Sequence, residues 1–253
     1  MPAPSRFHTA LEVRAVGERL AMPLTTPLLR RLPRGDGHQV LVLPGFTAGD
    51  RSTRELRSAL DHLGYRTRGW ELGANLGPTP EIVTGLMELA ESIKRSGERI
   101  SIVGWSLGGI FGRELARRAP ASVRQVITLG SPIHMSPGDP SATRELWRAL
   151  AARRRLTPGR RPLEQDRPPL PVPTTSIYTR SDGVVHWSTC VIERGPHAEN
   201  VEVYGSHCGL GFNAAAIMVV ADRLAQTDGT WHAFRAPLFA RPWFPPAVDR
   251  DVA

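Results

Sequence analysis

The chain has 253 residues and a mass of 27.7 kDa, a length that suits one α/β domain. Hydrophobic residues make up 41% of it and charged residues 22%, which excludes global disorder. No run approaches the roughly 18 apolar residues of a membrane-spanning helix, and residues 1–8 lead into no apolar signal-peptide core. We therefore expect a cytoplasmic protein with a single domain over residues 1–253.

The net charge of +8 raises the alternative of a nucleic-acid-binding protein. Every basic residue except Lys94 is Arg, and these residues are spread along the chain, with one dense stretch at 153–161. No zinc-finger spacing or RNP-like aromatic motif accompanies them, so codon bias explains the excess and no nucleic-acid partner is expected. The two cysteines are too few for a disulfide scaffold or an all-cysteine metal site.

Short apolar runs alternate with helical stretches through most of the chain. Residues 39–43 form a continuous apolar run, which is typical of a strand buried on both faces of a parallel sheet. A helix is predicted over 50–63, with Ser52 or Thr53 as its N-cap. Further strands are predicted at 65–70, 99–103, 123–129, 174–179 and 200–204, and further helices at 80–96, 107–118 and 211–224. This alternation indicates a mostly parallel α/β sheet covered by helices on both faces.

Two segments fall outside the alternation. Residues 134–173 contain a helix-like piece at 141–155 and then a Pro- and Arg-rich piece, a length that indicates a cap-like insertion over one end of the sheet. The tail from about residue 228 is too apolar for a disordered end. We expect it to pack back on the domain, with a membrane-surface or partner role as the alternative.

The sharpest motif is the run Gly104-Trp105-Ser106-Leu107-Gly108-Gly109, which follows an apolar strand and opens a helix. This is G-x-S-x-G in the strand–turn–helix context that the motif requires. A nucleophile on so tight a turn adopts strained backbone angles, and Gly104 and Gly108 lie where a Cβ would crowd the turn. Ser106 is therefore the predicted nucleophile, and it requires a base and an oxyanion site.

The base and the acid are expected later in the chain, because folds that use this motif run in the order nucleophile, acid, histidine. His207 lies between glycines directly after the last predicted strand, and Asp182 directly follows the strand predicted at 174–179. We assign His207 as the general base and Asp182 as the acid that orients it. The alternatives are His186, His197 and His232 for the base, and Glu164, Asp166 and Glu193 for the acid.

An oxyanion site is predicted at the run Leu43-Pro44-Gly45-Phe46-Thr47, which ends the first strand. A turn there would point backbone N–H groups at the serine. The N–H groups of Phe46 and Leu107 are the candidates, and Leu107 gains from its place at a helix start.

Together these segments resemble the serine esterase and lipase branch of the α/β-hydrolase superfamily, most of all bacterial triacylglycerol-lipase-like hydrolases. The resemblance covers roughly residues 38–224, and it departs from many lipases in ending the first strand with Pro-Gly instead of His-Gly. The segments that carry it are 43–46, 104–109, 181–185 and 205–211.

The resemblance implies an α/β-hydrolase fold and a serine hydrolase of carboxylic esters that works through an acyl-enzyme. The alternatives are an acyltransferase or thioesterase with the same triad, or a non-catalytic binding protein. No metal or organic cofactor is implied, and the expected partner is a small-molecule or lipid ester. Contact with a membrane surface and the oligomeric state are left open. On the insertion, Leu146 and Trp147 either pack on the body or form an acyl-binding wall, with Met135 and Phe46 as further lining.

The two cysteines lie close to the predicted acid and base. Cys190 follows Asp182 by eight residues, and Cys208 directly follows His207. If the triad is right, a disulfide between them would tie the acid and base loops together. Reduced thiols are the alternative, because no export signal is evident and cytosolic thiols usually stay reduced.

Overall fold

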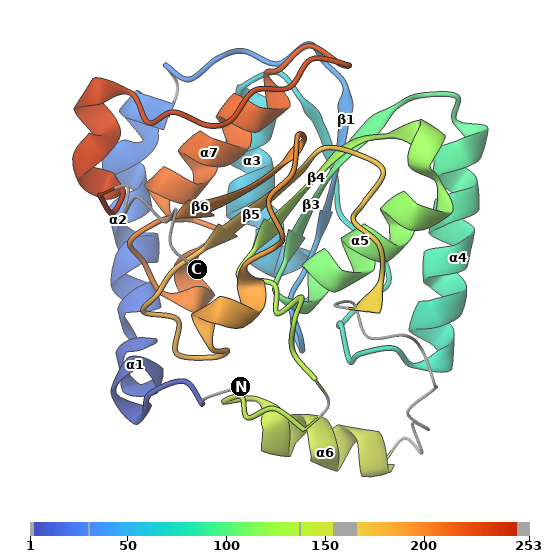
Figure 1. Cartoon of the computed structure of the whole chain (residues 1–253), viewed down its shortest axis with the longest axis vertical. Coiled ribbons are helices and arrows are strands. Elements are labelled where there is room, and N and C mark those ends of the chain that lie inside the picture. The colour runs from blue at the N-terminus through green and yellow to red at the C-terminus, as the bar shows by residue number, and fades with distance from the viewer. Residues whose placement is uncertain (1–2, 30, 137, 154–165, 247–253) are drawn as a thin grey trace.

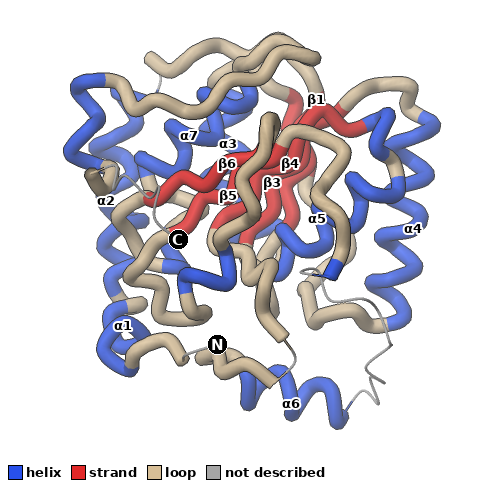
Figure 2. Tube along the Cα trace, viewed as in Figure 1, coloured by secondary structure: helices blue, strands red, loops and turns tan. Residues whose placement is uncertain are grey.

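A parallel sheet lies at the centre of the computed structural model, which describes residues 3–29, 31–136, 138–153 and 166–246 (Figure 1). Within these ranges the sheet has six strands in the order β2-β1-β3-β4-β5-β6, and each neighbouring pair is parallel (Figure 2). The strands are β1 (Gln39–Leu43), β2 (Arg66–Arg68), β3 (Ile100–Trp105), β4 (Val123–Leu129), β5 (Thr174–Tyr178) and β6 (Ala198–Glu202). The predicted α/β fold class with a mainly parallel sheet is confirmed.

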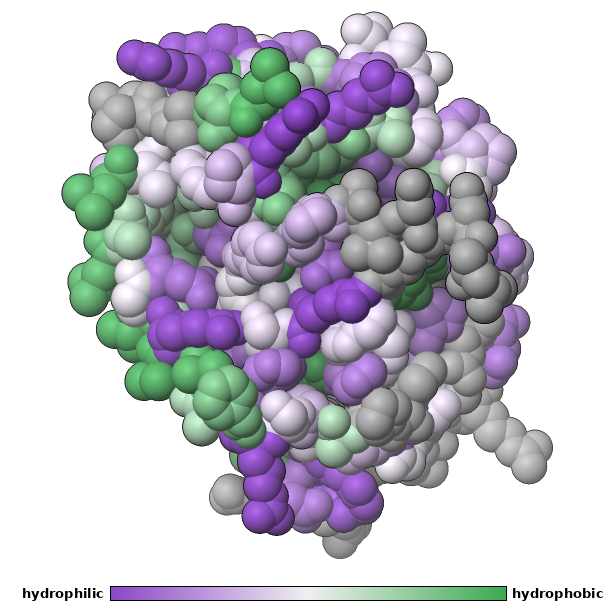
Figure 3. Space-filling model, turned by 60° about the vertical axis from the view of Figure 1, so that its left-hand side comes forward, coloured by the Kyte–Doolittle hydropathy of each residue, from purple (hydrophilic) through white to green (hydrophobic). Residues whose placement is uncertain are grey.

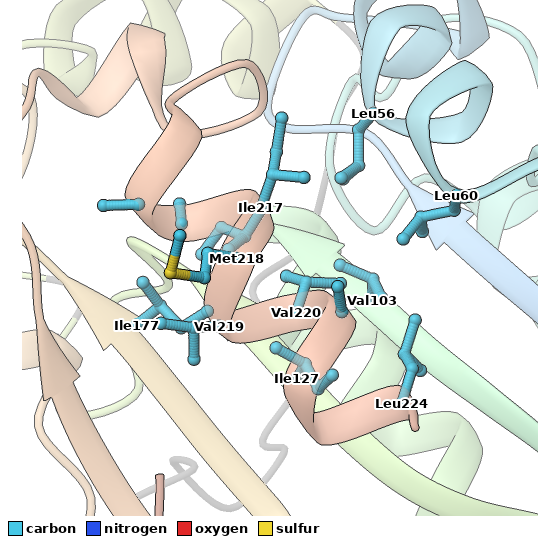
Figure 4. Close-up of a cluster of buried hydrophobic side chains, with 14 of the residues drawn as sticks. Leu56, Leu60, Val103, Ile127, Ile177, Ile217, Met218, Val219, Val220 and Leu224 are labelled. Atoms are coloured by element: carbon cyan, nitrogen blue, oxygen red, sulfur yellow. The ribbon is translucent and has the colours of Figure 1, made fainter. Parts of the chain in front are cut away.

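Side chains of each strand alternate between the two faces of the sheet, and both faces are apolar. Val40 and Val42 of β1 belong to one buried cluster, whereas Leu41 and Leu43 belong to the other. Two helices cover each face: α3 (Arg54–His62) and α7 (Ala214–Leu224) the first, α4 (Pro80–Arg95) and α5 (Leu107–Arg118) the second. Figure 4 shows side chains of α7 between those of α3 and those of strands β3 to β5.

The helix ends follow capping chemistry. The side chain of Thr79 accepts a hydrogen bond of 3.3 Å from the N–H of Ile82 at the start of α4, and Asn213 caps α7 in the same way. The helices predicted from residues 50 and 211 therefore begin later, because 50–53 form a 3-10 turn and the Asn213 cap sets the start of α7. The last strand lies at 198–202, two residues before its predicted position.

Two helices that no sequence pattern indicated precede the sheet, α1 (Arg6–Leu11) and α2 (Arg14–Leu29). Pro23 and Pro27 lie within α2, and prolines are unfavourable in a helix interior because they lack the N–H donor. Helix α2 lies against α7 and against the turn at 207–209 that carries the predicted base. The N-terminal segment therefore reaches the predicted site.

The insertion contains helix α6 (Arg144–Arg153), which lies below the edge of the sheet at which the strands end (Figure 1). Part of its predicted Pro- and Arg-rich piece lies outside the described residues. The C-terminal tail packs on the first apolar cluster, where Ala240 is fully buried and the rings of Phe234 and Phe244 are in contact. Within the described ranges no helix combines the length and the apolar character that crossing a bilayer requires.

Candidate active site

Ser106 lies between the end of β3 and the start of α5 with a backbone φ of 52°. Such a left-handed conformation is costly for a residue other than glycine, and the surrounding packing holds it in place. A Cβ on Gly104 would lie 2.3 Å from the Cα of Gly109, and one on Gly108 would lie 2.4 Å from the carbonyl oxygen of Leu43. Both glycines are therefore required for the turn, as the motif predicts.

His207 and Asp182 meet at the carboxyl edge of the sheet. The Nδ1 atom of His207 lies 2.6 Å from Oδ2 of Asp182, and both side chains are buried. The other oxygen of Asp182 accepts hydrogen bonds of 2.9 and 2.8 Å from the N–H groups of Val184 and Val185. These bonds fix the carboxylate, which in turn orients the imidazole.

The charge state of His207 follows from these contacts. Burial lowers the pKa of His207, but the adjacent Asp182 carboxylate outweighs burial, with a further contribution from Glu12. The net effect raises the pKa of the imidazole above its ordinary value of 6.5. This arrangement stabilises the imidazolium that a general base becomes after it takes a proton.

Ser106 and His207 both border the end of β4. The N–H of Ser106 donates a hydrogen bond of 2.7 Å to the carbonyl of Leu129, and a Cβ on Gly130 would lie 3.1 Å from Nδ1 of His207. The indole N–H of Trp105 donates a 3.1 Å hydrogen bond to the carbonyl of His207. The structure thus brings the predicted nucleophile and the predicted base to one place on the sheet edge.

The turn after β1 lies against Ser106. A Cβ on Gly45 would be 3.3 Å from the Cβ of Ser106, and Thr47 has a φ of 64°. Asn75, which is fully buried, holds this turn: its side chain donates a 2.8 Å hydrogen bond to the carbonyl of Pro44, and its backbone carbonyl accepts one of 2.7 Å from Thr47. Asn75 was not predicted from sequence, because a single Asn in a loop carries no motif.

The N–H groups of Phe46 and Leu107 are the predicted oxyanion donors. Neither donates to an acceptor among the described residues, whereas the neighbouring N–H groups of Ser106 and Thr47 are both engaged. Leu107 is the first residue of α5, so its N–H points out of the positive end of that helix. Two unpaired donors beside a strained serine suit a developing negative charge.

Glu12, between α1 and α2, joins the acid loop to the base loop. One carboxylate oxygen accepts hydrogen bonds of 2.8 Å from the N–H of Gly183 and 3.0 Å from the N–H of His207. The other accepts one of 2.8 Å from the N–H of Cys208. A single carboxylate therefore bridges the acid loop and the base loop. No sequence signal marks Glu12, since its partners lie more than 170 residues away.

Arg14 and Glu18 of α2 continue this contact. The guanidinium of Arg14 donates hydrogen bonds to the carbonyls of Ser181 and Gly205, at 3.1 and 2.6 Å. Glu18 accepts one of 2.9 Å from the N–H of Ser206. Burial raises the pKa of Glu18, although the bonds from Ser206 and the nearby Arg14 oppose that shift.

Comparison with solved structures finds the same architecture in several enzymes. MGS-MChE2, an alpha/beta hydrolase enzyme from the metagenome of lagoon sediments of Mar Chica, Morocco, is 17% identical, with a TM-score of 0.52 over 75% of this chain and 90% of its own. The monoacylglycerol lipase of Paleococcus ferrophilus is 15% identical, with a TM-score of 0.52 over 76% and 96%. The RedJ thioesterase of the prodiginine pathway in Streptomyces coelicolor is 18% identical, with a TM-score of 0.50 over 73% and 85%.

The chain has the α/β-hydrolase fold. Its structural neighbours are hydrolases that include a lipase and a thioesterase. Neither the protein-family models nor the curated proteins contain a match to the sequence. At this level of identity the likeness establishes the α/β-hydrolase fold alone.

The structure shows other contacts for two of the alternative bases. His186 contacts Ser188 through its Nδ1 atom at 2.7 Å, and burial lowers the pKa of its imidazole. The ring of His197 contacts Trp231 near the C-terminal tail. The remaining alternatives are His232, which follows α7, Asp166 in a short 3-10 turn, Glu193 in a loop, and Glu164, which lies outside the described residues.

Of the two alternatives for the cysteines, the structure has the reduced one: Cys190 and Cys208 are free thiols. Cys190 is fully buried in a cluster with Tyr178 and Val185. Cys208 is exposed, and its backbone N–H donates a hydrogen bond to Glu12. Loss of solvation and the Glu12 carboxylate raise the pKa of Cys208 to about 12.

A second Asp-His-Ser arrangement lies at the opposite end of the sheet. The Nδ1 atom of His38 contacts Oδ1 of Asp36, and its Nε2 atom lies 2.8 Å from Oγ of Ser101. Ser101, the second residue of β3, is fully buried, so no substrate reaches it. Burial is also the main cause that lowers the pKa of His38. Asp36, His38 and Ser101 are therefore connected like a catalytic triad, but a substrate cannot reach the serine.

The predicted cap residue Trp147 contacts the predicted oxyanion turn. Its ring lies 5.3 Å from that of Phe46, centroid to centroid, and a Cβ on Gly77 would lie 2.3 Å from the indole. Leu146, next to it on α6, is exposed. Among the described residues, no group of three or more His, Cys, Asp or Glu side chains is placed to hold a metal ion.

Proposed function

We propose that this protein is a serine hydrolase of carboxylic esters. The observation that carries the proposal is the strained Ser106 at a strand–helix turn, on the same sheet edge as the buried His207–Asp182 pair. Hydrolases among the structural neighbours support the same reading at the level of the fold. In this proposal Ser106 is the nucleophile, His207 the general base and Asp182 the acid that orients it.

The reaction proceeds in two steps. Ser106 Oγ attacks the ester carbonyl while His207 Nε2 takes its proton, and the N–H groups of Phe46 and Leu107 stabilise the oxyanion. Collapse of this intermediate breaks the ester C–O bond, and His207 returns the proton to the leaving alcohol. Water, deprotonated by His207, then attacks the acyl-enzyme, which releases the acid and restores Ser106.

Hydrolysis of p-nitrophenyl esters from acetate to palmitate tests the proposal. We expect turnover by the wild type and a loss in Ser106→Ala of about 10⁶-fold in kcat, the order seen when a triad nucleophile is removed. A fluorophosphonate should label Ser106, identified by mass spectrometry of the labelled peptide. Absence of both turnover and labelling would contradict the proposal and favour a non-catalytic binding role.

A parallel assay with a thioester substrate distinguishes ester hydrolysis from thioesterase activity, the second candidate function. The thioesterase among the structural neighbours motivates the comparison. Acyl-N-acetylcysteamine and the oxygen ester of the same acyl group present one acyl chain with two leaving groups. A larger kcat/KM for the oxygen ester supports ester hydrolysis, whereas a larger value for the thioester assigns the same triad to thioesterase chemistry.

A further inference from the structure

The outer face of α2 is largely apolar, and its residues Arg14 and Glu18 point inward to the acid and base loops. Four large apolar side chains, which are 62% to 83% exposed, recur every three or four residues from the turn before α2 along the helix. Phe7 of α1 is also exposed, and together these five residues form what we call the α2 stripe: Phe7, Val13, Val16, Leu20 and Leu24. Figure 3 shows apolar residues gathered on the side of the molecule where α1 and α2 lie.

The inward charges of α2 explain why the stripe is exposed. Glu12, Arg14 and Glu18 bind the acid and base loops, so the polar face of the helix is its buried face. The opposite face must then point to solvent, and it carries leucine and valine instead of the charged residues usual on a surface helix. Exposed apolar groups gathered in this way mark an interaction surface.

The charges around the stripe are positive. Residues 1–37 contain six Arg and three acidic residues. All three acids are engaged, since Glu12 and Glu18 bind backbone N–H groups and Asp36 accepts a hydrogen bond from Arg124. The exposed basic side chains of this segment are those of Arg6, Arg19, Arg31 and Arg34, of which Arg19 pairs with Glu55 of α3.

An apolar stripe flanked by exposed arginines complements an anionic lipid surface. Apolar side chains enter the boundary between headgroups and acyl chains, and each arginine near the surface adds attraction to anionic headgroups. A second copy of the chain would meet arginines with arginines. The stripe is also about 16 Å long and one helix wide, which is small against the roughly 800 Å² per partner of a standard interface.

We propose that the α2 stripe docks this protein on an anionic lipid surface. Helix α1 lies at the end of the molecule where α6 and the carboxyl ends of the strands lie (Figure 1). Docking therefore holds the candidate site near lipid. The proposal does not rest on the hydrolase function, because it is tested by binding alone.

Vesicle flotation measures this binding. We expect the wild type to float with phosphatidylcholine vesicles that contain phosphatidylglycerol, and to bind phosphatidylcholine alone more weakly. Raising the salt from about 0.1 M to about 1 M, which shortens the screening length from about 10 Å to about 3 Å, weakens binding to the anionic vesicles. The double variant Leu20→Gln/Leu24→Gln lowers the partition coefficient about tenfold or more.

A matched variant removes exposed apolar surface elsewhere. Met87 is a large, half-exposed side chain on α4, on another side of the molecule (Figure 1), so Met87→Ser should bind vesicles like the wild type. The proposal is overturned if the wild type does not bind anionic vesicles, or if Leu20→Gln/Leu24→Gln and Met87→Ser lose binding equally. It is also overturned if sedimentation shows a lipid-free dimer that Leu20→Gln/Leu24→Gln converts to a monomer, since the stripe would then be a homodimer surface.

Discussion

The carboxylate of Glu12 accepts a hydrogen bond of 3.0 Å from the backbone N–H of His207, 195 residues further along the chain. Because the same carboxylate also binds the N–H of Gly183, it sets the distance between the loops of the proposed acid and base. Its negative charge also contributes to the raised pKa of His207. Glu12 thus acts on the site without lying among the reacting groups.

We predict that kcat/KM for ester hydrolysis rises with pH through an apparent pKa above 6.5. The proposed base must be neutral, and the pKa of His207 is raised, so activity is lost as pH falls through that value. Glu12→Gln removes one negative charge and should move this limb to lower pH. Glu91→Gln, which alters an exposed pair on α4, is the control. Identical profiles for Glu12→Gln and the wild type would contradict the electrostatic role.

The two triad-like clusters predict opposite outcomes for two serine substitutions. Ser101→Ala removes a buried hydrogen bond to His38 and should cost about 1–2 kcal/mol of unfolding free energy while ester hydrolysis persists. Ser106→Ala should abolish hydrolysis with little change in stability. Urea unfolding and p-nitrophenyl ester turnover of both variants decide this. Loss of activity in Ser101→Ala with a normal fold would show that the wrong serine was chosen.

The buried His38 also predicts a pH dependence of stability. Burial lowers the pKa of His38 in the folded chain, so the unfolded chain binds a proton that the folded chain does not. Its contribution is complete above the ordinary value of 6.5 and is lost as pH falls below it. We expect the unfolding free energy to fall between about pH 7 and pH 5, and His38→Gln to flatten this decline. An unchanged slope in the variant would argue against His38.

Most of the fold was predictable because strands β1, β3 and β4 are apolar runs bounded by clear turn signals. Helix α5 and strand β4 were predicted with the bounds that the structure shows. The predicted start of α7 was wrong because the Asn213 cap sets it. The predicted bounds of β6 were wrong because its pairing with β5 determines where the strand begins and ends. Helices α1 and α2 were missed because tertiary contacts stabilise them despite two internal prolines.

The residues of the candidate site were predictable where they lie directly after strands of the sheet. Asp182 and His207 were chosen because they follow β5 and β6, and the structure brings their side chains into contact. Asn75 and Glu12 act through side-chain contacts to distant backbone groups, which leave no periodic pattern in the sequence. The sequence left the state of the two cysteines open, because proximity of two loops does not fix the distance between their thiols.

We predict that Asn75→Ala lowers kcat more than it changes KM. Loss of the side-chain hydrogen bond to Pro44 frees the turn that carries the N–H of Phe46, and a displacement of about 1 Å costs on the order of 10²-fold in rate. Asn200→Ala removes similar bonds to the backbone of Ile192, away from the site, and should leave kcat unchanged. Equal effects of the two variants on kcat would exclude this role for Asn75.

The thiols provide a test that is independent of catalysis. We expect two free thiols after denaturation, and at about pH 8 in the native state one thiol that reacts slowly. Cys208 is exposed but its pKa of about 12 keeps it protonated, whereas Cys190 is fully buried. Titration with a chromogenic disulfide, before and after urea, measures both. If no thiol reacts in urea without reductant, the two cysteines form a disulfide and the prediction is wrong.

The contacts of Glu12 and Glu18 also constrain when the site can form. Their partners lie at residues 183 and 206–208, so most of the chain must leave the ribosome before either carboxylate finds its hydrogen bonds. Contacts of such long sequence separation close late, because the intervening chain must first give up its freedom. The N-terminal helices are therefore synthesised first, but their contacts with the acid and base loops form last. A nascent chain stalled before residue 182 would contain the strained turn at Ser106 but neither Asp182 nor His207, and Glu12 would have none of its partners.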